Sequence, residues 1–578
     1  MVKTDEDYIY ERKKYLEAIL DSKAEKKLII AGPGTGKTNT FKQVLETTFC
    51  LSKKKGLVIT FIRNLVKDLE KDLRHLADVK TFHSFCRSEI KRIKGRDFEY
   101  YPNLLEIIKE DLLILKPSPR IGKKALDNYF YELNENIIKE AIRIADYYNA
   151  GGHTDSVYRV YDHYQSNDKI IPKYSIVLVD EYQDFNLLET KLVEMLAMKS
   201  PILIVGDDDQ ALYTFKDSNP KFIRELAKNR CYKRYELPYC SRCTKVIVDA
   251  INEIVSISKK NNWLVNRIDK KFLYFPPEKE KDSEENPLLV DIQCSVERKD
   301  CLYAAKFIIH EIFKMHDEYK KEALERSEPA ALIIGPGQFL KSIKSYMENM
   351  NTELLKNGWT YIAKKEEINK PRVIDAYKLL LNNPNSKLGW RIVLGQKNDK
   401  NTKNIIKGAI EGNKLITSLI NGNVYNEYKK IIDILKKLYK QNPIQGAEIR
   451  FIEEKIKIPL KKIRESFIDE EEDGDSEEEK SDKPRILCTS FEGSKGLSAQ
   501  YVFIVGFNAG HFPRRNPPTD LDICRLIVAL TRARKKVYLI SYGNLGGQFL
   551  KDSIFKSYLK KYLSNKTLVN KNYIKRLS

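Results

Sequence analysis

The sequence predicts an α/β protein built on parallel sheets. Short apolar runs recur along the chain, and stretches of helical character separate them, which is the pattern of successive βαβ units. Strands that are covered by helices on both faces appear as nearly continuous apolar runs of this kind. The runs lie at residues 27–30, 56–59, 331–334, 485–488, 501–505 and 537–540. With 578 residues, the chain has room for about three to five domains.

The chain is strongly basic. It has 102 Lys and Arg residues against 81 Asp and Glu, a formal charge of +21, which indicates a polyanionic partner. A membrane partner is disfavoured, because no apolar stretch approaches the ~20 residues of a spanning helix. The N-terminal stretch MVKTDEDYIYERKKY lacks the apolar centre of a secretory signal. Nine scattered cysteines suit a reducing compartment, so we expect a cytoplasmic protein.

One segment opposes this charge. Residues 469–482 read DEEEDGDSEEEKSD and carry a net charge of −9, so the rest of the chain carries +30. Such a run is typical of a solvated linker. The alternative is an acidic flap that competes with nucleic acid for the basic surface. Residues 276–287 (PPEKEKDSEENP) suggest a second, milder linker.

A glycine-rich turn follows the first apolar run. Residues 31–38 read AGPGTGKT and precede a helix-like segment, which is the strand–turn–helix context of a phosphate-binding loop. Gly34 and Gly36 allow backbone N–H groups to face phosphate oxygens. Lys37 would reach the β- and γ-phosphates, and the Thr38 hydroxyl would ligate Mg²⁺. The predicted nucleotide-binding set is Gly32, Pro33, Gly34, Thr35, Gly36, Lys37 and Thr38.

Another predicted strand, within residues 175–184, is followed by acidic residues. Residues 175–184 read SIVLVDEYQD, so Asp180 and Glu181 follow an apolar run at the carboxyl edge of the sheet, where ligands bind in α/β folds. Asp180 would hold the Mg²⁺ ion, and Glu181 would polarise the attacking water. We therefore expect ATP and Mg²⁺ as cofactors.

DEYQD and AGPGTGKT together resemble the superfamily 1 DNA helicases of the UvrD/Rep/PcrA kind, and further motifs follow in the family's order. Residues 60–64 (TFIRN) are similar to a segment that touches single-stranded DNA, and residues 81–86 (TFHSFC), 206–215 (GDDDQALYTF) and 490–497 (SFEGSKGL) are similar to later motifs. The resemblance implies that Gln210 senses the γ-phosphate. It also implies these DNA-contacting residues: Phe61, Arg63, Asn64, Thr81, His83, Tyr213, Phe215, Ser494 and Lys495.

Two arginines complete the implied site. Residues 237–244 (LPYCSRCT) match LxxNYRST by spacing and place Arg242 as a phosphate-binding arginine, while residues 521–534 (LDICRLIVALTRAR) supply Arg532. The implied catalytic set is Glu181, Lys37, Gln210, Arg242 and Arg532. Transfer of a γ-phosphoryl group requires cations around its spreading charge. If the two arginines and Lys37 come from different halves, hydrolysis is complete only when the halves close.

The resemblance implies two RecA-like P-loop domains with parallel sheets, each carrying a mainly helical insertion. We expect the first domain at residues 1–92 and 169–227, with an insertion at 93–168. The second domain is expected at 228–375 and 484–578, with a reduced insertion at 376–483 that ends in the acidic linker. We place these domain boundaries from the alternation of predicted strands and helices along the chain.

The expected function is ATP hydrolysis by a DNA helicase or translocase that moves on single-stranded DNA, 3′-to-5′ by resemblance, in repair, recombination or defence. Single-stranded and tailed duplex DNA are the expected partners, with a separate nuclease or repair protein as a further one. The alternatives are a DNA-stimulated translocase subunit without autonomous unwinding, a non-motor ATP-switched nucleic-acid-binding protein, and an RNA motor.

Two local features bear on the base and on metal binding. No glutamine precedes the phosphate-binding loop, so Tyr8, Tyr10 or Arg12 is left to contact the base. Cys240 and Cys243 form a CxxC pair around Arg242, but no second CxxC exists, so the sequence predicts no zinc site.

Overall fold

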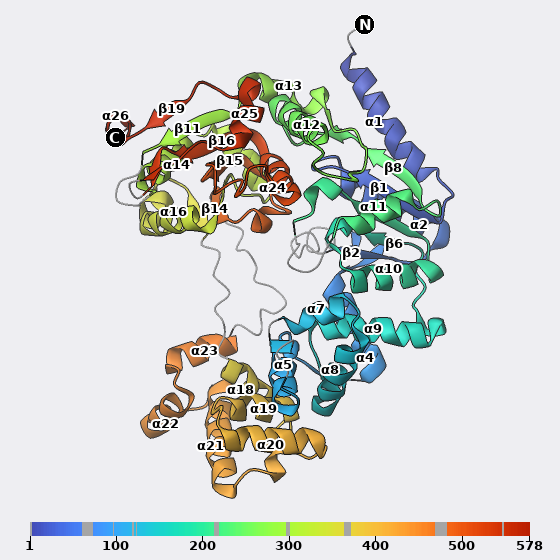
Figure 1. Cartoon of the computed structure of the whole chain (residues 1–578), viewed down its shortest axis with the longest axis vertical. Helices are drawn as coiled ribbons and strands as arrows, with labels where there is room; N and C mark the ends of the chain where they lie inside the picture. The colour runs from blue at the N-terminus through green and yellow to red at the C-terminus, as the bar shows by residue number, and fades with distance from the viewer. Residues whose placement is uncertain are drawn as a thin grey trace.

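The fold was determined from a computed structural model. It describes residues 3–60, 73–95, 98–117, 121–122, 124–212, 219–295, 301–362, 372–468, 482–545 and 548–577. Two parallel sheets form the centres of two lobes, and a helical bundle lies apart from the second lobe, beside the helices inserted in the first (Figure 1). The predicted α/β class with parallel sheets and helical insertions is confirmed.

The first sheet has six strands, all parallel. Their spatial order is β3 (Ala77–Thr81), β2 (Gly56–Thr60), β6 (Val177–Val179), β7 (Ile202–Gly206), β1 (Lys26–Ala31) and β8 (Lys233–Leu237). Nearly every residue of the central strands is buried, because helices cover both faces. The covering helices include α1 (Asp5–Leu20), α2 (Lys37–Ser52), α4 (Phe82–Lys94), α10 (Leu187–Lys199) and α11 (Lys221–Lys228).

Strand β8 corrects one predicted boundary. The sequence placed the end of the first domain at residue 227, but β8 pairs in parallel with β1 from Lys27↔Lys233 to Ala31↔Leu237. The first sheet therefore extends past this limit. β8 was missed because its first four residues, Lys-Arg-Tyr-Glu, are exposed or only partly buried at the sheet edge and form no apolar run.

The second sheet has seven parallel strands. Their order is β13 (Thr360–Ile362), β14 (Arg485–Thr489), β12 (Ala331–Ile334), β15 (Ala499–Val505), β16 (Ala533–Tyr542), β11 (Val290–Cys294) and β19 (Thr567–Val569). The helices around it include α12 (Lys245–Lys260), α14 (Leu302–Phe313), α15 (Asp317–Glu325), α16 (Gly337–Asn349), α17 (Asn351–Lys356), α24 (Asp520–Leu530), α25 (Ile554–Tyr558) and α26 (Lys571–Leu577).

The proline-rich stretch at residues 276–287 is not a linker. It forms helix α13 (Pro276–Glu285), which starts with proline at its first positions. Lys279 and Asp282 are buried there and pair with each other at 2.6 Å, and Asp282 also pairs with Lys535 at 2.5 Å. Two of its charged side chains are directed into this network, which the composition alone does not reveal.

The two helical insertions pack together. The first comprises α5 (Leu104–Leu115), α7 (Leu126–Tyr131), α8 (Glu135–Tyr148) and α9 (His153–Ser166). The second comprises α18 (Arg372–Asn382), α19 (Lys387–Gly395), α20 (Lys400–Glu411), α21 (Gly422–Tyr439), α22 (Gly446–Ile456) and α23 (Leu460–Ile468). Apolar side chains of both insertions belong to one continuous core. In Figure 1 the orange bundle of the second insertion lies beside α5 and α8.

A buried ion pair fixes this contact. Arg391 on α19 lies 2.6 Å from Asp111 on α5, and the Tyr148 hydroxyl donates to the same carboxylate at 2.6 Å. Asp111 is fully buried, so its charge depends on these partners. Across the described ranges, no helix is both long enough and apolar enough to cross a membrane.

Candidate nucleotide-binding site

The phosphate-binding loop lies between β1 and α2. Gly34 and Gly36 have positive φ angles of 70° and 91°, which glycine adopts without steric cost. A Cβ on Gly34 would lie 2.4 Å from Cβ of Arg242, so a side chain there would displace the arginine. The Thr35 hydroxyl donates to the Gly32 carbonyl at 2.9 Å and holds the turn. Helix α2 begins at Lys37, and its N-terminal N–H groups therefore lie at this loop.

The acids expected beside the loop are in place. Asp180 and Glu181 follow β6, and Nζ of Lys37 lies 3.2 Å from Oε1 of Glu181. Glu181 has a left-handed backbone with φ 52°, a conformation that non-glycine residues adopt rarely and mostly at functional sites. Burial alone would raise the pKa of Glu181, but the charges of Lys37 and Lys495 outweigh it and hold the pKa below its ordinary value. Glu181 is therefore an ionised carboxylate at neutral pH.

Asp180 is the buried neighbour of Glu181. Burial, followed by the like charge of Glu181, raises the pKa of Asp180 to about 6. A divalent cation would reverse this effect, because it favours the ionised form. The donor set fits Mg²⁺, which prefers hard oxygen ligands and retains water: the Asp180 carboxylate ends β6, and the exposed Thr38 hydroxyl lies in the first turn of α2.

Gln210 connects the first sheet with the second. It follows β7, and its Nε2 donates to Asp207 at 2.8 Å. Its Oε1 accepts from Nη2 of Arg532 at 3.4 Å, although Arg532 belongs to the second lobe. A side chain expected to sense the γ-phosphate thus contacts an arginine expected to bind it.

Arg242 packs against the loop, and Arg532 lies beside Arg242 and Gln210. Nη1 of Arg242 donates to the Thr531 carbonyl at 3.5 Å, next to Arg532, and its side chain packs on Gly34. Burial and the nearby charge of Arg242 lower the pKa of Arg532 below its ordinary value. A phosphate anion would offset this repulsion, because it pairs with both guanidinium groups.

The structure places Ser494 and Lys495 differently from the expectation. Both were predicted to contact DNA, but Ser494 is fully buried, and its hydroxyl donates to the Phe491 carbonyl at 2.6 Å. The Lys495 ammonium is ion-paired with Asp184 and lies 3.4 Å from Oε2 of Glu181. Only 2% of its side chain is exposed, so it joins the acids of the nucleotide site and presents no surface to DNA.

The remaining predicted DNA contacts fall into two groups. Thr81 caps α4 by accepting from the Ser84 N–H at 3.1 Å, and the His83 ring lies 5.0 Å from the ring of His153. Both side chains are partly exposed at the start of α4. The other predicted contacts lie outside the described residues: Phe61, Arg63, Asn64, Tyr213 and Phe215.

Two polar residues of the site were missed at the sequence level. Gln183 donates to Glu181 and accepts from the Asp207 N–H at 3.0 Å, so it joins the ends of β6 and β7. Asp184 is buried with Lys495, and burial raises its pKa to about 6 despite that charge. Their position in DEYQD could have indicated them. Four polar residues directly after an apolar strand are more than the end of a strand needs for contact with solvent.

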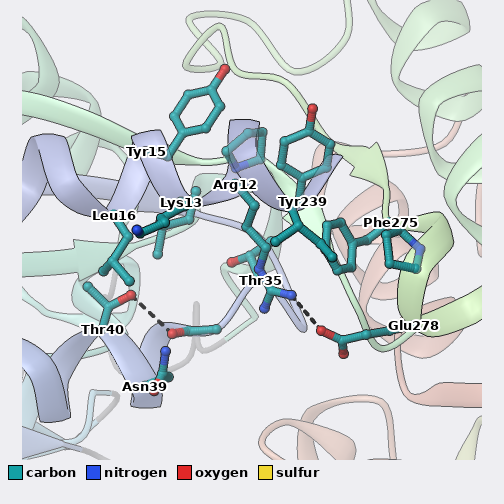
Figure 2. Close-up of a pocket in the computed structure, with 15 residues that line it drawn as sticks. Arg12, Lys13, Tyr15, Leu16, Thr35, Asn39, Thr40, Tyr239, Phe275 and Glu278 are labelled. Atoms are coloured by element: carbon teal, nitrogen blue, oxygen red, sulfur yellow. Dashed lines mark hydrogen bonds and ion pairs between the residues drawn. The ribbon is translucent and has the colours of Figure 1, made fainter. Parts of the chain in front are cut away.

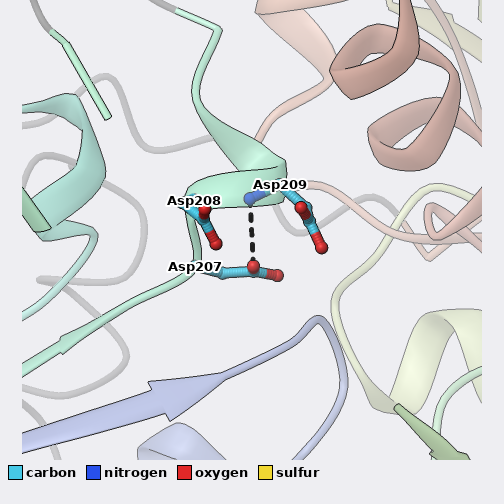
Figure 3. A group of neighbouring side chains, drawn as sticks. All are labelled: Asp207, Asp208 and Asp209. Carbon is cyan, nitrogen blue, oxygen red and sulfur yellow. Dashed lines mark hydrogen bonds between the residues drawn. The ribbon is translucent and has the colours of Figure 1, made fainter. Parts of the chain in front are cut away.

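The three consecutive aspartates Asp207, Asp208 and Asp209 form a carboxylate cluster (Figure 3). Such a cluster could suit a metal, but three basic residues already neutralise it: Arg224 lies 2.9 Å from Asp208, and the other two follow α12. Lys270 pairs with all three carboxylates, and Arg267 lies 2.6 Å from Asp209. Burial disfavours the Lys270 ammonium, yet the carboxylates raise its pKa above the ordinary value. The cluster therefore fastens the segment before Gln210 to the chain that follows α12.

A cavity of about 560 Å³ adjoins the phosphate-binding loop. Its walls include Tyr15 on α1, together with Tyr239 and Phe275 (Figure 2). Arg12 crosses it, with its guanidinium 4.5 Å from the Phe275 ring centre and 2.6 Å from Glu278. Aromatic walls with one charged pair suit a flat heterocycle. Of the residues proposed for the base, Arg12 lines this cavity, whereas Tyr10 is 59% exposed elsewhere on α1.

Comparisons with known proteins agree with this geometry. A family model described as an AAA domain matches residues 16–216. A probable DNA helicase II homolog of Mycoplasma capricolum subsp. capricolum is 23% identical, covering 91% of this chain and 84% of the relative. The corresponding protein of Mycoplasma pneumoniae is 22% identical over 92% and 84% of the two chains. The ATP-dependent DNA helicase PcrA of Staphylococcus aureus is 24% identical over 93% and 85%.

Fold and site together define an α/β protein with a phosphate-binding-type glycine turn, in which Gln210 of the first lobe contacts Arg532 of the second. The resemblance to the UvrD/Rep/PcrA-like superfamily 1 DNA helicases is confirmed, and it extends over more than nine tenths of the chain.

Proposed function

We propose that this protein is an ATP-dependent DNA helicase or translocase that moves on single-stranded DNA, 3′-to-5′, and couples hydrolysis to duplex unwinding. One observation carries the proposal: basic side chains of the second lobe end at the acids and Gln210 of the first. Arg532 reaches Gln210, and Lys495 reaches Asp184 and Glu181. A nucleotide bound there contacts both lobes, so its hydrolysis changes how the lobes are held together.

The hydrolytic step uses groups of both lobes. Lys37 would bind the β- and γ-phosphates, which removes it from Glu181. Glu181 then orients the attacking water and accepts its proton. Arg242 and Arg532 would stabilise the charge that spreads over the γ-phosphate. Thr38 and Asp180 would hold Mg²⁺, whose charge neutralises the phosphate oxygens.

The cavity beside the loop would hold the base. Tyr239 and Phe275 provide flat apolar walls, and the Arg12–Glu278 pair offers a donor and an acceptor to a purine edge. This pair supports recognition of adenine without an upstream glutamine, although guanine presents compatible groups on the same edge.

The DNA track would begin at the start of α4. Thr81 and His83 lie there, partly exposed, at the end of β3. Phe61, Arg63, Asn64, Tyr213 and Phe215 remain predicted contacts, with the aromatic side chains stacking on bases irrespective of sequence. The net charge of +21 supports a nucleic-acid partner.

Two assays test the proposal together. Steady-state ATP hydrolysis is measured with and without single-stranded DNA, and strand displacement is measured on duplexes with 3′ or 5′ tails. We expect hydrolysis that DNA stimulates and RNA does not, with displacement of 3′-tailed duplexes. DNA-stimulated hydrolysis without displacement would favour a translocase subunit, and nucleotide binding without turnover would favour an ATP-switched binding protein.

A further inference from the structure

Two cysteines lie against the phosphate-binding loop and enclose Arg242. Cys240 ends β9 (Tyr239–Cys240), and Cys243 lies just before Thr244, the N-cap of α12. Both are fully buried, and all nine cysteines of the chain are free thiols. The pair has CxxC spacing at a helix N-terminus, where the helix dipole stabilises a thiolate.

The two sulfur atoms interact. The Cys240 sulfur receives hydrogen bonds from the Cys243 thiol and from the backbone N–H groups of Arg242 and Cys243. Burial by itself would raise the pKa of Cys240, but these hydrogen bonds outweigh it and lower the pKa to about 6. The lowered pKa favours the thiolate form of Cys240, and a second thiol lies beside it.

The pair is in contact with the catalytic groups. The Ser241 N–H donates to the Gly34 carbonyl at 3.0 Å, and a Cβ on Gly34 would lie 3.2 Å from the Cys240 sulfur. The Cys243 sulfur lies 3.9 Å from the Thr531 carbonyl, which also accepts from Arg242. A bond between these sulfurs would therefore form directly beside the phosphate-binding loop and the backbone of Arg242.

We propose that Cys240 and Cys243 are a site of reversible oxidation, in which a disulfide across Arg242 switches off the nucleotide site. The proposal rests on the function proposed above. A ring closed through Cys240, Ser241, Arg242 and Cys243 fixes the backbone that carries the arginine. It also removes the thiol–carbonyl contact at Thr531.

The oxidant is a small peroxide, which suits a buried sulfur better than a bulky disulfide does. The Cys240 thiolate attacks one oxygen of hydrogen peroxide, the O–O bond breaks, and hydroxide leaves, which gives a sulfenic acid. The Cys243 sulfur then attacks this sulfur, the S–O bond breaks, and the departing hydroxide takes the thiol proton as water. In sum, one thiolate and one thiol become a disulfide, and one peroxide becomes one water and one hydroxide, which takes a proton from solvent to give a second water.

The site is tested by mapping disulfides in the full chain. The protein is treated with hydrogen peroxide, its free thiols are alkylated in denaturant, and peptides are analysed by mass with and without dithiothreitol. We expect two of the nine thiols to be lost as one bond between Cys240 and Cys243. An unoxidised pair, or a bond between Cys294 and Cys301 instead, would overturn the proposal.

The switch is tested by ATP hydrolysis before oxidation, after it, and after reduction. We expect oxidation to lower turnover by about tenfold or more, because small displacements of catalytic groups have effects of this size, and dithiothreitol to restore it. Each variant is compared with its own reduced rate: Cys243→Ser should lose no turnover on treatment with peroxide, whereas Cys86→Ser, at another buried cysteine, should lose turnover as the unaltered chain does.

Two outcomes separate the two proposals. A mapped disulfide with unchanged turnover contradicts the switch. Absent turnover in the reduced protein contradicts the proposed function, while the mapping still decides whether the disulfide forms. If Cys243→Ser fails to fold, Cys240→Ser gives the same comparison, and the mapping of the wild-type chain needs neither variant.

Discussion

Nζ of Lys37 lies 3.2 Å from Oε1 of Glu181, so the phosphate-binding lysine and the proposed general base neutralise each other in this structure. Both side chains are nearly buried, with 14% and 11% exposed. ATP would compete for the lysine, and its binding would free the glutamate for water. The substrate thereby activates the base only when a γ-phosphate is present.

The Glu181→Gln variant tests this role. We expect kcat to fall by about 10²- to 10⁴-fold, the range for loss of a general base. ATP binding should be retained, because the neutral glutamine no longer competes with the phosphates of ATP for Lys37. Steady-state ATP hydrolysis and equilibrium binding of a fluorescent ATP analogue measure the two effects. Glu194→Gln, an exposed residue on α10, is the control. Normal turnover in Glu181→Gln would contradict the assignment.

Lys495 tests the link between the lobes. In Lys495→Ala, Asp184 stays buried without its charge partner, so we expect a lower unfolding temperature together with lost ATP hydrolysis. The double variant Lys495→Ala/Asp184→Asn should regain thermal stability without regaining hydrolysis, because Glu181 still lacks Lys495. Thermal unfolding and ATP hydrolysis give both quantities. Equal unfolding temperatures of the single and double variants would show that loss of the ion pair does not cause the destabilisation.

Arg12 tests the cavity for the base. We expect Arg12→Ala to raise KM for ATP about tenfold, or about 1.4 kcal/mol, with kcat changed little, because the side chain lies in the base cavity away from Glu181. Measuring KM for GTP in parallel shows whether the Arg12–Glu278 pair selects the base. Lys14→Ala, an exposed cation on the same helix, should leave KM unchanged. An unaltered KM in Arg12→Ala would place the base elsewhere.

Arg391 tests the contact between the insertions. Arg391→Ala leaves Asp111 buried and unpaired, which we expect to cost roughly 3–5 kcal/mol at this contact. Spin labels at Lys139 on α8 and Lys429 on α21 should then show a broader distance distribution, while basal ATP hydrolysis stays unchanged. The exposed Arg450→Ala variant is the control. A narrow distribution in Arg391→Ala would mean that the shared apolar core suffices.

The acidic run tests the distribution of charge. Residues 469–481 of the run lie outside the described residues, so this prediction rests on the sequence. Deleting residues 469–482 should tighten binding of single-stranded DNA about tenfold at low salt and steepen its salt dependence. A control variant with a glycine–serine segment of equal length in place of the run distinguishes the effect of its charge from the effect of its length. Unchanged affinity would identify the run as a plain linker.

The sequence by itself determined the chemistry of the first lobe. The order strand, glycine turn, helix fixes where Lys37 and Thr38 stand, because each depends only on neighbouring backbone geometry. The same holds for Asp180 and Glu181 at the end of β6. The apolar runs likewise located the central strands, since a strand buried on both faces has few polar positions.

Only the tertiary structure decided which distant residues meet. Lys495 and Asp184 are 311 positions apart, and Arg391 and Asp111 are 280 apart, so no local pattern could pair them. The burial of Lys495, the cavity around Arg12 and the place of Cys240 against Gly34 each depend on how separate segments pack. Motif spacing assigns residues to a reaction, whereas packing sets the distance and dielectric through which their charges act.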